Sequence, residues 1–281
     1  MRRIRHSQVP SNRCRADRNV PNERCLACEY SRTMSGTGRQ YRSEVSFAME
    51  VAPRIHLLRA FGCQVFALLD DAGVTLIDAG SPGSAPLVLR QLRSLGVQPR
   101  DVTRIVLTHY HVDHRGAAES LRRATGATVL IHEIEAPFLR GELPYPNPVR
   151  APFRAMLTAP LMAAMRGRPI PVETLEEGEM LEVLGGLRVI HTPGHTPGSI
   201  ALALPALGIL FSGDTMGFSR RRLEEPVPLL CEDTTAARGS IERLARLEVE
   251  TICFSHFPPL RRGARGALQT LVRTWAGEEA R

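Results

Sequence analysis

Four side chains able to bind a metal ion fall within six consecutive positions. They are His109, His111, Asp113 and His114, and they follow an apolar run at 104–108 that is typical of a buried strand. Imidazoles and a carboxylate crowded at a strand end are costly to desolvate unless a cation compensates them. Imidazole nitrogen and carboxylate oxygen are usual ligands of borderline-soft divalent metals. The spacing therefore indicates a metal site, rather than a polar loop rich in histidine by chance.

The backbone geometry of this stretch divides the four side chains into two pairs. In an extended segment His109 and His111 point the same way, because side chains alternate with a period of two. Asp113 and His114 are adjacent in the chain and cannot both share that direction. This arrangement suits two metal ions side by side, one held by each pair.

Further motifs downstream make the chain similar to a known family. His-x-His-x-Asp-His after an apolar strand is the signature of the metallo-β-lactamase-fold hydrolases. The match continues in the family's order through TPGHTPGS at 192–199, FSGDT at 211–215 and FSH at 254–256. Asp78, in the run LIDAG, matches an earlier aspartate of the family. The resemblance spans residues 54–256 and implies an α/β fold, a four-layer αβ/βα sandwich.

The resemblance also implies a ligand set for two metal ions, with zinc expected and iron or manganese as alternatives. One ion would take His109, His111 and His195, the second Asp113, His114 and His256, and Asp214 would bridge them. A hydroxide bridging the two ions would attack a carbonyl carbon, and Asp113 would orient it and carry its proton to the leaving group. Asp78 would either bond to the turn that follows it or support the ligands from behind.

The position of Asp214 narrows the expected reaction. The resemblance implies that true β-lactamases lack this bridging aspartate, whereas esterases, thioesterases, lactonases and glyoxalase-II-like members have it. We therefore expect hydrolysis of an ester, thioester or lactone in a small-molecule acyl substrate. The segment after His256 is too short for the glutathione-binding domain of glyoxalase II. The tyrosine that similar lactonases place after the aspartate is missing, and Tyr145 is a candidate substitute.

Two other functions remain as alternatives. A branch of the family with similar residues uses a single iron as a persulfide dioxygenase, and metal content would distinguish one iron from two zinc ions. A sensor that binds an acyl metabolite with little or no turnover belongs to a different class. Nucleic acid is not an expected partner, because most of the net charge of +7 lies in residues 1–48 and leaves the remainder without a basic groove.

Composition divides the chain near residue 48. Residues 1–48 are rich in Arg, Ser, Asn and Pro and poor in aliphatic residues, which predicts a disordered Arg-rich tail. Residues 49–281 are the predicted catalytic domain. No apolar run approaches the roughly 20 residues that span a bilayer, and the N-terminus lacks a secretory pattern. We expect a cytoplasmic protein with reduced thiols and no membrane span, and a homodimer is left open.

The elements that must position the ligands follow from periodicity. Apolar patterns predict strands at 55–59, 64–69, 74–77, 104–108, 128–131, 187–191, 199–204, 208–211 and 251–255, and helices at 86–95, 116–125, 235–247 and 268–275. Strand clusters separated by helices, with ligands at strand ends, fit two half-sandwiches, 54–132 and 180–260.

Residues 133–178 separate the first ligand motif from the second half and form a predicted insertion. It contains a Pro-rich stretch at 143–148 and an apolar, Met-rich helix candidate at 153–165. The functional hypothesis is a helical lid that roofs the metal site and shapes an acyl pocket. The alternatives are a helix packed on the core and a helix lying on a membrane surface. The run Arg220 to Arg222 is either a solvated turn or a contact for a substrate carboxylate or phosphate.

Overall fold

The computed structural model describes residues 48–145, 168–275 and 277. All of these belong to one compact unit, Val45–Arg281. Residues 1–47 of the tail predicted at 1–48, and the helix candidate at 153–165, lie outside the described residues. The lid hypothesis therefore stays a prediction.

The first sheet combines an antiparallel half with a parallel half. Its described strands follow the order β1 (Met49–Ala52), β2 (Ile55–Arg59), β3 (Gln64–Asp70), β4 (Gly73–Ile77), β5 (Val102–Val106), β6 (Thr128–His132) and β7 (Glu173–Leu175). Pairing is antiparallel from β1 to β4 and parallel from β4 to β7. The parallel strands β4, β5 and β6 are connected through helices, as parallel neighbours require.

The second sheet brings the later ligand motifs to one edge. Its described strands lie in the order β14 (Thr251–Cys253), β11 (Ile209–Phe211), β10 (Ile200–Leu204), β9 (Leu187–His191) and β8 (Met180–Leu181). Because β10 is antiparallel to both β9 and β11, and β14 is parallel to β11, the strands β9, β11 and β14 run in the same direction. Their carboxyl ends therefore meet at the same edge of the sheet.

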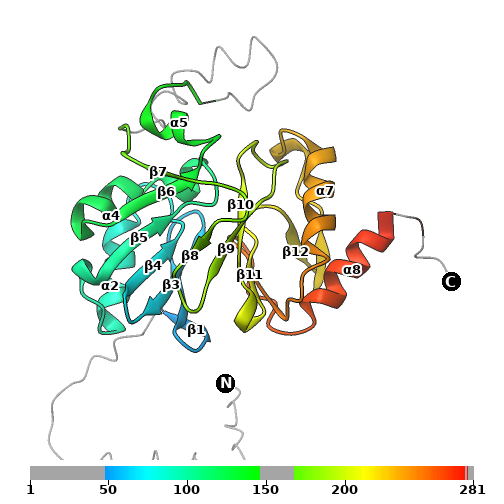
Figure 1. Ribbon diagram of the computed structural model, residues 1–281, viewed down its shortest axis with the longest axis horizontal. Coiled ribbons are helices and arrows are strands. Elements are labelled where there is room, and N and C mark those ends of the chain that lie inside the picture. Colours follow the sequence, from blue (N-terminus) through cyan, green and yellow to red (C-terminus); the bar gives the residue numbers. More distant parts are fainter. Residues whose placement is uncertain (1–47, 146–167, 276, 278–281) are drawn as a thin grey trace, which may run out of the picture. The chain divides into compact units, whose positions relative to one another are not determined.

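Alternating side chains explain why the two sheets stack with helices outside them (Figure 1). In β3, Val65 and Ala67 pack toward the helices, whereas Phe66 and Leu68 pack toward the second sheet. The side chains of β10 alternate in the same way between the inter-sheet core and a third core, which lies beneath the helices that cover the second sheet. The rings of Phe66 and Phe211 meet across the sheets with centroids 5.2 Å apart. The predicted four-layer αβ/βα sandwich is confirmed.

The outer layers consist of helices from the predicted segments. Two helices, α2 (Ala85–Ser94) and α4 (Ala118–Thr125), pack against the first sheet, and α7 (Thr234–Leu244) and α8 (Ala264–Trp275) against the second. The Asp233 carboxylate caps α7 by accepting hydrogen bonds from the N–H groups of Thr235 and Ala236. Predicted strands agree with the structure within two residues at each end, and predicted helices within four.

Several short elements were not predicted. The strand β7 lies within the segment assigned to the insertion, yet it pairs with β6 as the last strand of the first sheet. The helix α5 (Ala136–Arg140) begins the same segment. The hairpin β12 (Gly217–Ser219) and β13 (Arg222–Glu224) follows the Asp214 motif, and Arg220 and Arg221 form its exposed two-residue turn. Arg220 and Arg221 thus lie in an exposed turn and Arg222 is exposed on β13, and a contact of the run with a substrate anion stays a prediction.

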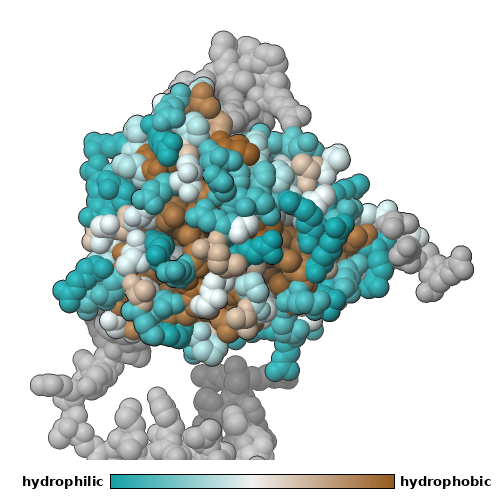
Figure 2. Space-filling view, in the orientation of Figure 1, coloured by the Kyte–Doolittle hydropathy of each residue, from teal (hydrophilic) through white to brown (hydrophobic). Residues whose placement is uncertain are grey.

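The face shown in Figure 2 is a mosaic of hydrophilic residues with smaller apolar areas between them. The exposed large apolar residues include Phe61 and three residues within four positions, Val227, Leu229 and Leu230. Within the described ranges, the helices are all too short or too polar to cross a bilayer.

Candidate metal centre

The seven predicted ligands come from four loops, each following the carboxyl end of a strand. The first loop follows β5 and carries His109, His111, Asp113 and His114. The other loops follow β9, β11 and β14 and carry His195, Asp214 and His256, respectively. The first loop belongs to one sheet and the other three to the second sheet. The site therefore lies where the two halves of the sandwich meet.

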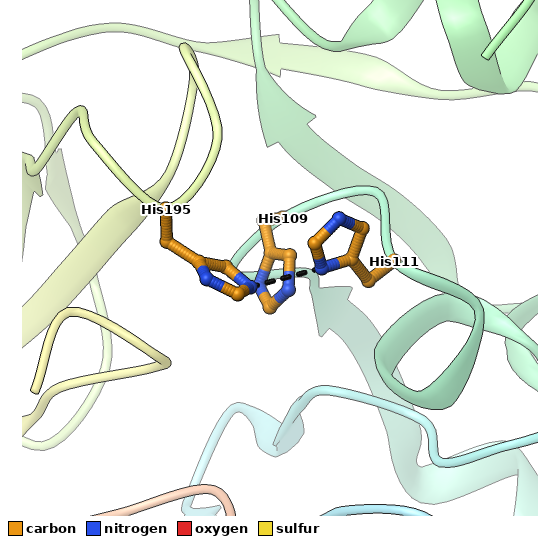
Figure 3. Close-up of side chains that lie close together, drawn as sticks. All are labelled: His109, His111 and His195. Atoms are coloured by element: carbon orange, nitrogen blue, oxygen red, sulfur yellow. Dashed lines mark hydrogen bonds between the residues drawn. The ribbon is translucent and has the colours of Figure 1, made fainter. Parts of the chain in front are cut away.

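Three histidines from both halves converge on one point (Figure 3). Ligand nitrogens of His109, His111 and His195 lie within 4.8 Å of one another, and His195 Nε2 is 2.9 Å from His111 Nδ1. Burial lowers the pKa of His109 well below its usual value and that of His111 to about 3, and neighbouring imidazoles add to both shifts. Burial also lowers the pKa of His195. These rings are neutral at physiological pH, the form that binds metals.

A second cluster lies beside the first. Its members are Asp113, His114 and His256, whose ligand atoms also lie within 4.8 Å of one another. His114 Nε2 is 3.2 Å from His256 Nε2, and Asp113 Oδ2 is 3.5 Å from His256 Nε2. Unlike the extended segment that was predicted, Asp113 and His114 sit on a helical turn, α3 (Val112–Arg115). The turn forms because the His111 carbonyl accepts from the N–H groups of His114 and Arg115.

The Asp214 carboxylate lies between the two clusters. Its Oδ2 is 3.5 Å from His195 Nε2 of the first cluster and 3.2 Å from His256 Nε2 of the second. Its Oδ1 is 3.5 Å from His114 Nε2. Burial alone would raise the pKa of Asp214, but His114 and His256 hold it well below its usual range. An ionised carboxylate between two groups of imidazoles is suited to bridge two cations.

Two loop groups fix the orientation of the second cluster. His114 Nδ1 donates to Asp78 Oδ2 over 2.9 Å, and Asp78 Oδ1 accepts from the Thr108 N–H over 2.8 Å. His256 Nδ1 donates to the Gly62 carbonyl over 3.1 Å. Both histidines therefore present Nε2 to the site. Asp78 was expected either to bond to the turn that follows it or to support the ligands from behind. In the structure it supports His114.

Two unsatisfied atoms test whether this site suits a metal ion. His109 Nε2 and Asp214 Oδ1 are buried and have no hydrogen-bond partner among the described residues. Such groups are costly to bury unless something compensates them, and a divalent cation between them would do so. Burial disfavours the charged form of His114. Cys63 and the carboxylates of Asp214 and Asp78 nevertheless raise the pKa of His114 well above its usual value. The seven side chains fit a metal centre, and ligation by each stays a prediction.

Sequence reasoning missed several residues that surround the ligands. Tyr110 and Glu232 are hydrogen-bonded to each other, and the buried Glu135 contacts the loop that carries His195. Cys63 lies within 4.8 Å of ligand atoms of Asp78 and His114. Tyr110 stands between two ligands in the sequence, but long-range packing brings Glu135, Glu232 and Cys63 to the site, and no local pattern marks them. Tyr145, the candidate catalytic tyrosine, packs on Tyr110 with ring centroids 5.6 Å apart, and a role in catalysis stays a prediction.

Comparison with known proteins identifies the family. A sequence profile described as the metallo-beta-lactamase superfamily matches residues 58–256. The chain is 32% identical over 200 residues to a probable metallo-hydrolase, YflN, of Bacillus subtilis, covering 66% of this chain and 75% of that protein. It is also 32% identical over 189 residues to a hydroxyacylglutathione hydrolase of Rhodobacter capsulatus, covering 66% of this chain and 59% of that enzyme. The chain thus spans less than two thirds of the latter relative.

Solved structures show the same architecture. A metallo-beta-lactamase family protein of Thermus thermophilus superposes with a TM-score of 0.64 and 26% identity, covering 81% of each chain. The metallo-beta-lactamase SMB-1 superposes with a TM-score of 0.60 and 19% identity, covering 83% of this chain and 94% of that one, which supports the fold alone. The chain belongs to the metallo-beta-lactamase superfamily. Together with its hydrolase relatives, this makes it a metal-dependent hydrolase.

Proposed function

We propose that the protein is a dinuclear-metal hydrolase that cleaves an ester, thioester or lactone in a small acyl substrate. The observation that carries this proposal is the position of Asp214, with one carboxylate oxygen within 3.5 Å of a histidine from each cluster. A single iron can also take one carboxylate together with two histidines, so what favours two ions is that Asp214 faces histidines of both clusters. Relatives named hydroxyacylglutathione hydrolase favour a thioester among the three bond types.

The side chains of the site have different roles in such a reaction. Metal ions bound there, zinc being expected and iron or manganese the alternatives, would supply a hydroxide nucleophile near neutral pH and stabilise the oxyanion. The neutral imidazoles of the first cluster offer lone pairs. Asp113 retains 35% side-chain exposure, against 16% for Asp214, so it can reach both the nucleophile and the bulk solvent. We assign Asp113 to orienting the nucleophile and to delivering a proton to the leaving group.

Metal analysis combined with a substrate panel tests the proposal. Protein loaded with zinc should bind two ions per chain and hydrolyse thioesters, esters or lactones faster than phosphodiesters. One iron per chain with oxygen consumption on a persulfide would instead support the dioxygenase alternative. Tight binding of an acyl compound without turnover would support a sensor.

A cytoplasmic location and a homodimer stay predictions, and the free thiols of Cys63, Cys231 and Cys253 agree with a reducing compartment.

A further inference from the structure

Tyr110 separates the ligands His109 and His111, and its polar groups are held on two sides. Its carbonyl accepts from Arg115 Nε over 2.8 Å, and its hydroxyl donates to Glu232 Oε1. Only 4% of the residue is exposed. The position of the segment between the two histidines is therefore fixed by its neighbours.

Two glutamates, Glu135 and Glu232, hold the loop that carries His195. Glu135 accepts from Thr196 Oγ1 and from the Gly198 N–H, the latter over 3.2 Å. On the other side, the Glu232 N–H donates to the carbonyls of Gly194 and His195 over 2.9 and 3.3 Å. Glu232 thus links the loop after β5 to the loop after β9, and Glu135 links the loop after β9 to the segment that follows β6. The loops after β5 and β9 belong to different sheets, and the first metal site needs ligands from both.

Glu135 makes its link from a fully buried position. It follows β6, at the start of α5, and has no exposed surface. A Cβ atom at position 198 would lie 2.4 Å from Glu135 Cγ, so the approach of the carboxyl group requires the glycine found there. Glu135 Oε2 has no hydrogen-bond partner in the described part of the chain. Only one oxygen of the carboxyl group therefore accepts hydrogen bonds, and burial raises the pKa of Glu135 to about 8.

We propose that Glu135 is a positioning residue: by tying Thr196 and Gly198 to the start of α5 in the first half of the sandwich, its carboxyl oxygen holds His195 at the separation from His111 that the first metal ion needs. In the structure that separation is 2.9 Å between His111 Nδ1 and His195 Nε2. Glu135 itself touches neither ligand side chain in the hydrogen bonds described. The inference deepens the proposed function and rests on metal binding at this site.

Glu135→Gln and Glu135→Leu form a matched pair for the test. Glutamine keeps one accepting oxygen in place and, like the protonated acid, is uncharged, whereas leucine keeps much of the volume and removes the acceptor. Zinc affinity at the two sites is measured by competition with a chromophoric chelator, and Co²⁺ spectra report ligand geometry. The Leu variant should lose about 10- to 100-fold in affinity at one site, the range typical for groups that support ligands. The Gln variant should stay within about 3-fold of wild type, far inside that range.

A stability control separates positioning from folding. Leu139→Ala opens a cavity beneath α5, where the Leu139 side chain is buried, without removing a hydrogen-bond acceptor. It should lower the melting temperature of the metal-free protein while leaving zinc affinity unchanged. If Glu135→Leu does not fold, Thr196→Val removes one donor to Glu135 while keeping the shape, and it should also lower zinc affinity at one site only.

The outcomes distinguish this inference from the proposed function. Zinc affinity of Glu135→Leu equal to wild type would overturn the positioning role, as would equal losses in the Gln and Leu variants. A loss that Leu139→Ala reproduces at the same decrease in melting temperature would also overturn it. Wild-type protein that binds fewer than two zinc ions contradicts the dinuclear function itself, whatever the variants show.

Discussion

Among single residues, Asp214 carries the proposed chemistry, because it is an anion placed between two imidazole clusters. Asp214→Asn keeps the shape of the side chain but removes the charge that would be shared by two cations. We expect metal content below two per chain and turnover reduced by roughly 100-fold or more. Metal analysis and turnover are measured together, with the exposed Asp71→Asn as the control. Full metal content with near-normal turnover would rule out the bridging role.

Glu135 gives a second residue-scale prediction, for stability against pH. Its pKa is raised from 4.5 to about 8, so between these values the folded protein keeps a proton that the unfolded chain has released. The native state then binds more protons, and the free energy of unfolding falls as pH rises through this window. Glu135→Gln removes this contribution. Its unfolding free energy should fall less than that of wild type between about pH 5 and about pH 8 in urea titrations of metal-free protein. Identical pH profiles would contradict a protonated Glu135.

At the scale of elements, the loop between β2 and β3 closes on the second cluster. Gly62 has a φ of +84°, and a Cβ there would lie 2.7 Å from Asp113 Cβ and 2.3 Å from Ser81 Oγ. Gly62→Ala should displace Asp113 and the carbonyl that orients His256, and destabilise the fold by about 2 to 4 kcal/mol. Gly83→Ala is a matched control, because its φ is +90° but no atom lies within 4 Å. It should cost about 1 kcal/mol and leave metal content unchanged. Equal effects of the two substitutions in metal binding and urea unfolding would contradict the contact argument.

The β12–β13 hairpin offers a substitution expected to stabilise. Arg220 and Arg221 have φ values of 47° and 65°, the left-handed region that a two-residue turn of type I′ needs. Asn-Gly adopts this turn with less strain, so Arg220→Asn combined with Arg221→Gly should raise the free energy of unfolding by about 1 kcal/mol. Thermal melting checks this, with the exposed Arg222→Gln as the control. A large rise in KM for the double variant would show instead that the arginines contact a substrate anion.

At the scale of the whole molecule, the sequence predicts the sandwich because buried strands and amphipathic helices leave periodic patterns. The ligand motifs are local, with His109 to His114 in one run, so their presence is visible without a structure. The strand β7 has three residues and no pattern of its own, and it is defined only by pairing with β6. Glu135 lies 61 residues from Thr196, and no periodicity links the two. β7 and Glu135 were therefore missed because they depend on contacts between distant segments, whereas α5 and the β12–β13 hairpin were missed because they are short.

The metal centre joins two halves that are already packed, and this determines what metal removal should do. The inter-sheet core includes Leu57, Phe66, Leu202 and Phe211 and holds the sheets without any metal. Chelation should therefore leave the far-ultraviolet circular dichroism unchanged. Because metal binds only the native arrangement, saturation at about 100 times the Kd contributes about 3 kcal/mol, and chelation should lower the melting temperature by about 5 to 10 °C.

Asp214→Asn is the control for this experiment, since a protein that has lost its bridging anion has less metal to remove. Its melting temperature should respond less to chelator than that of the wild type. The comparison is made by thermal scans with and without chelator at one protein concentration. Loss of secondary structure on chelation would show that the metal is needed for the fold itself. An unchanged wild-type melting temperature would show that the seven side chains hold no tightly bound ion.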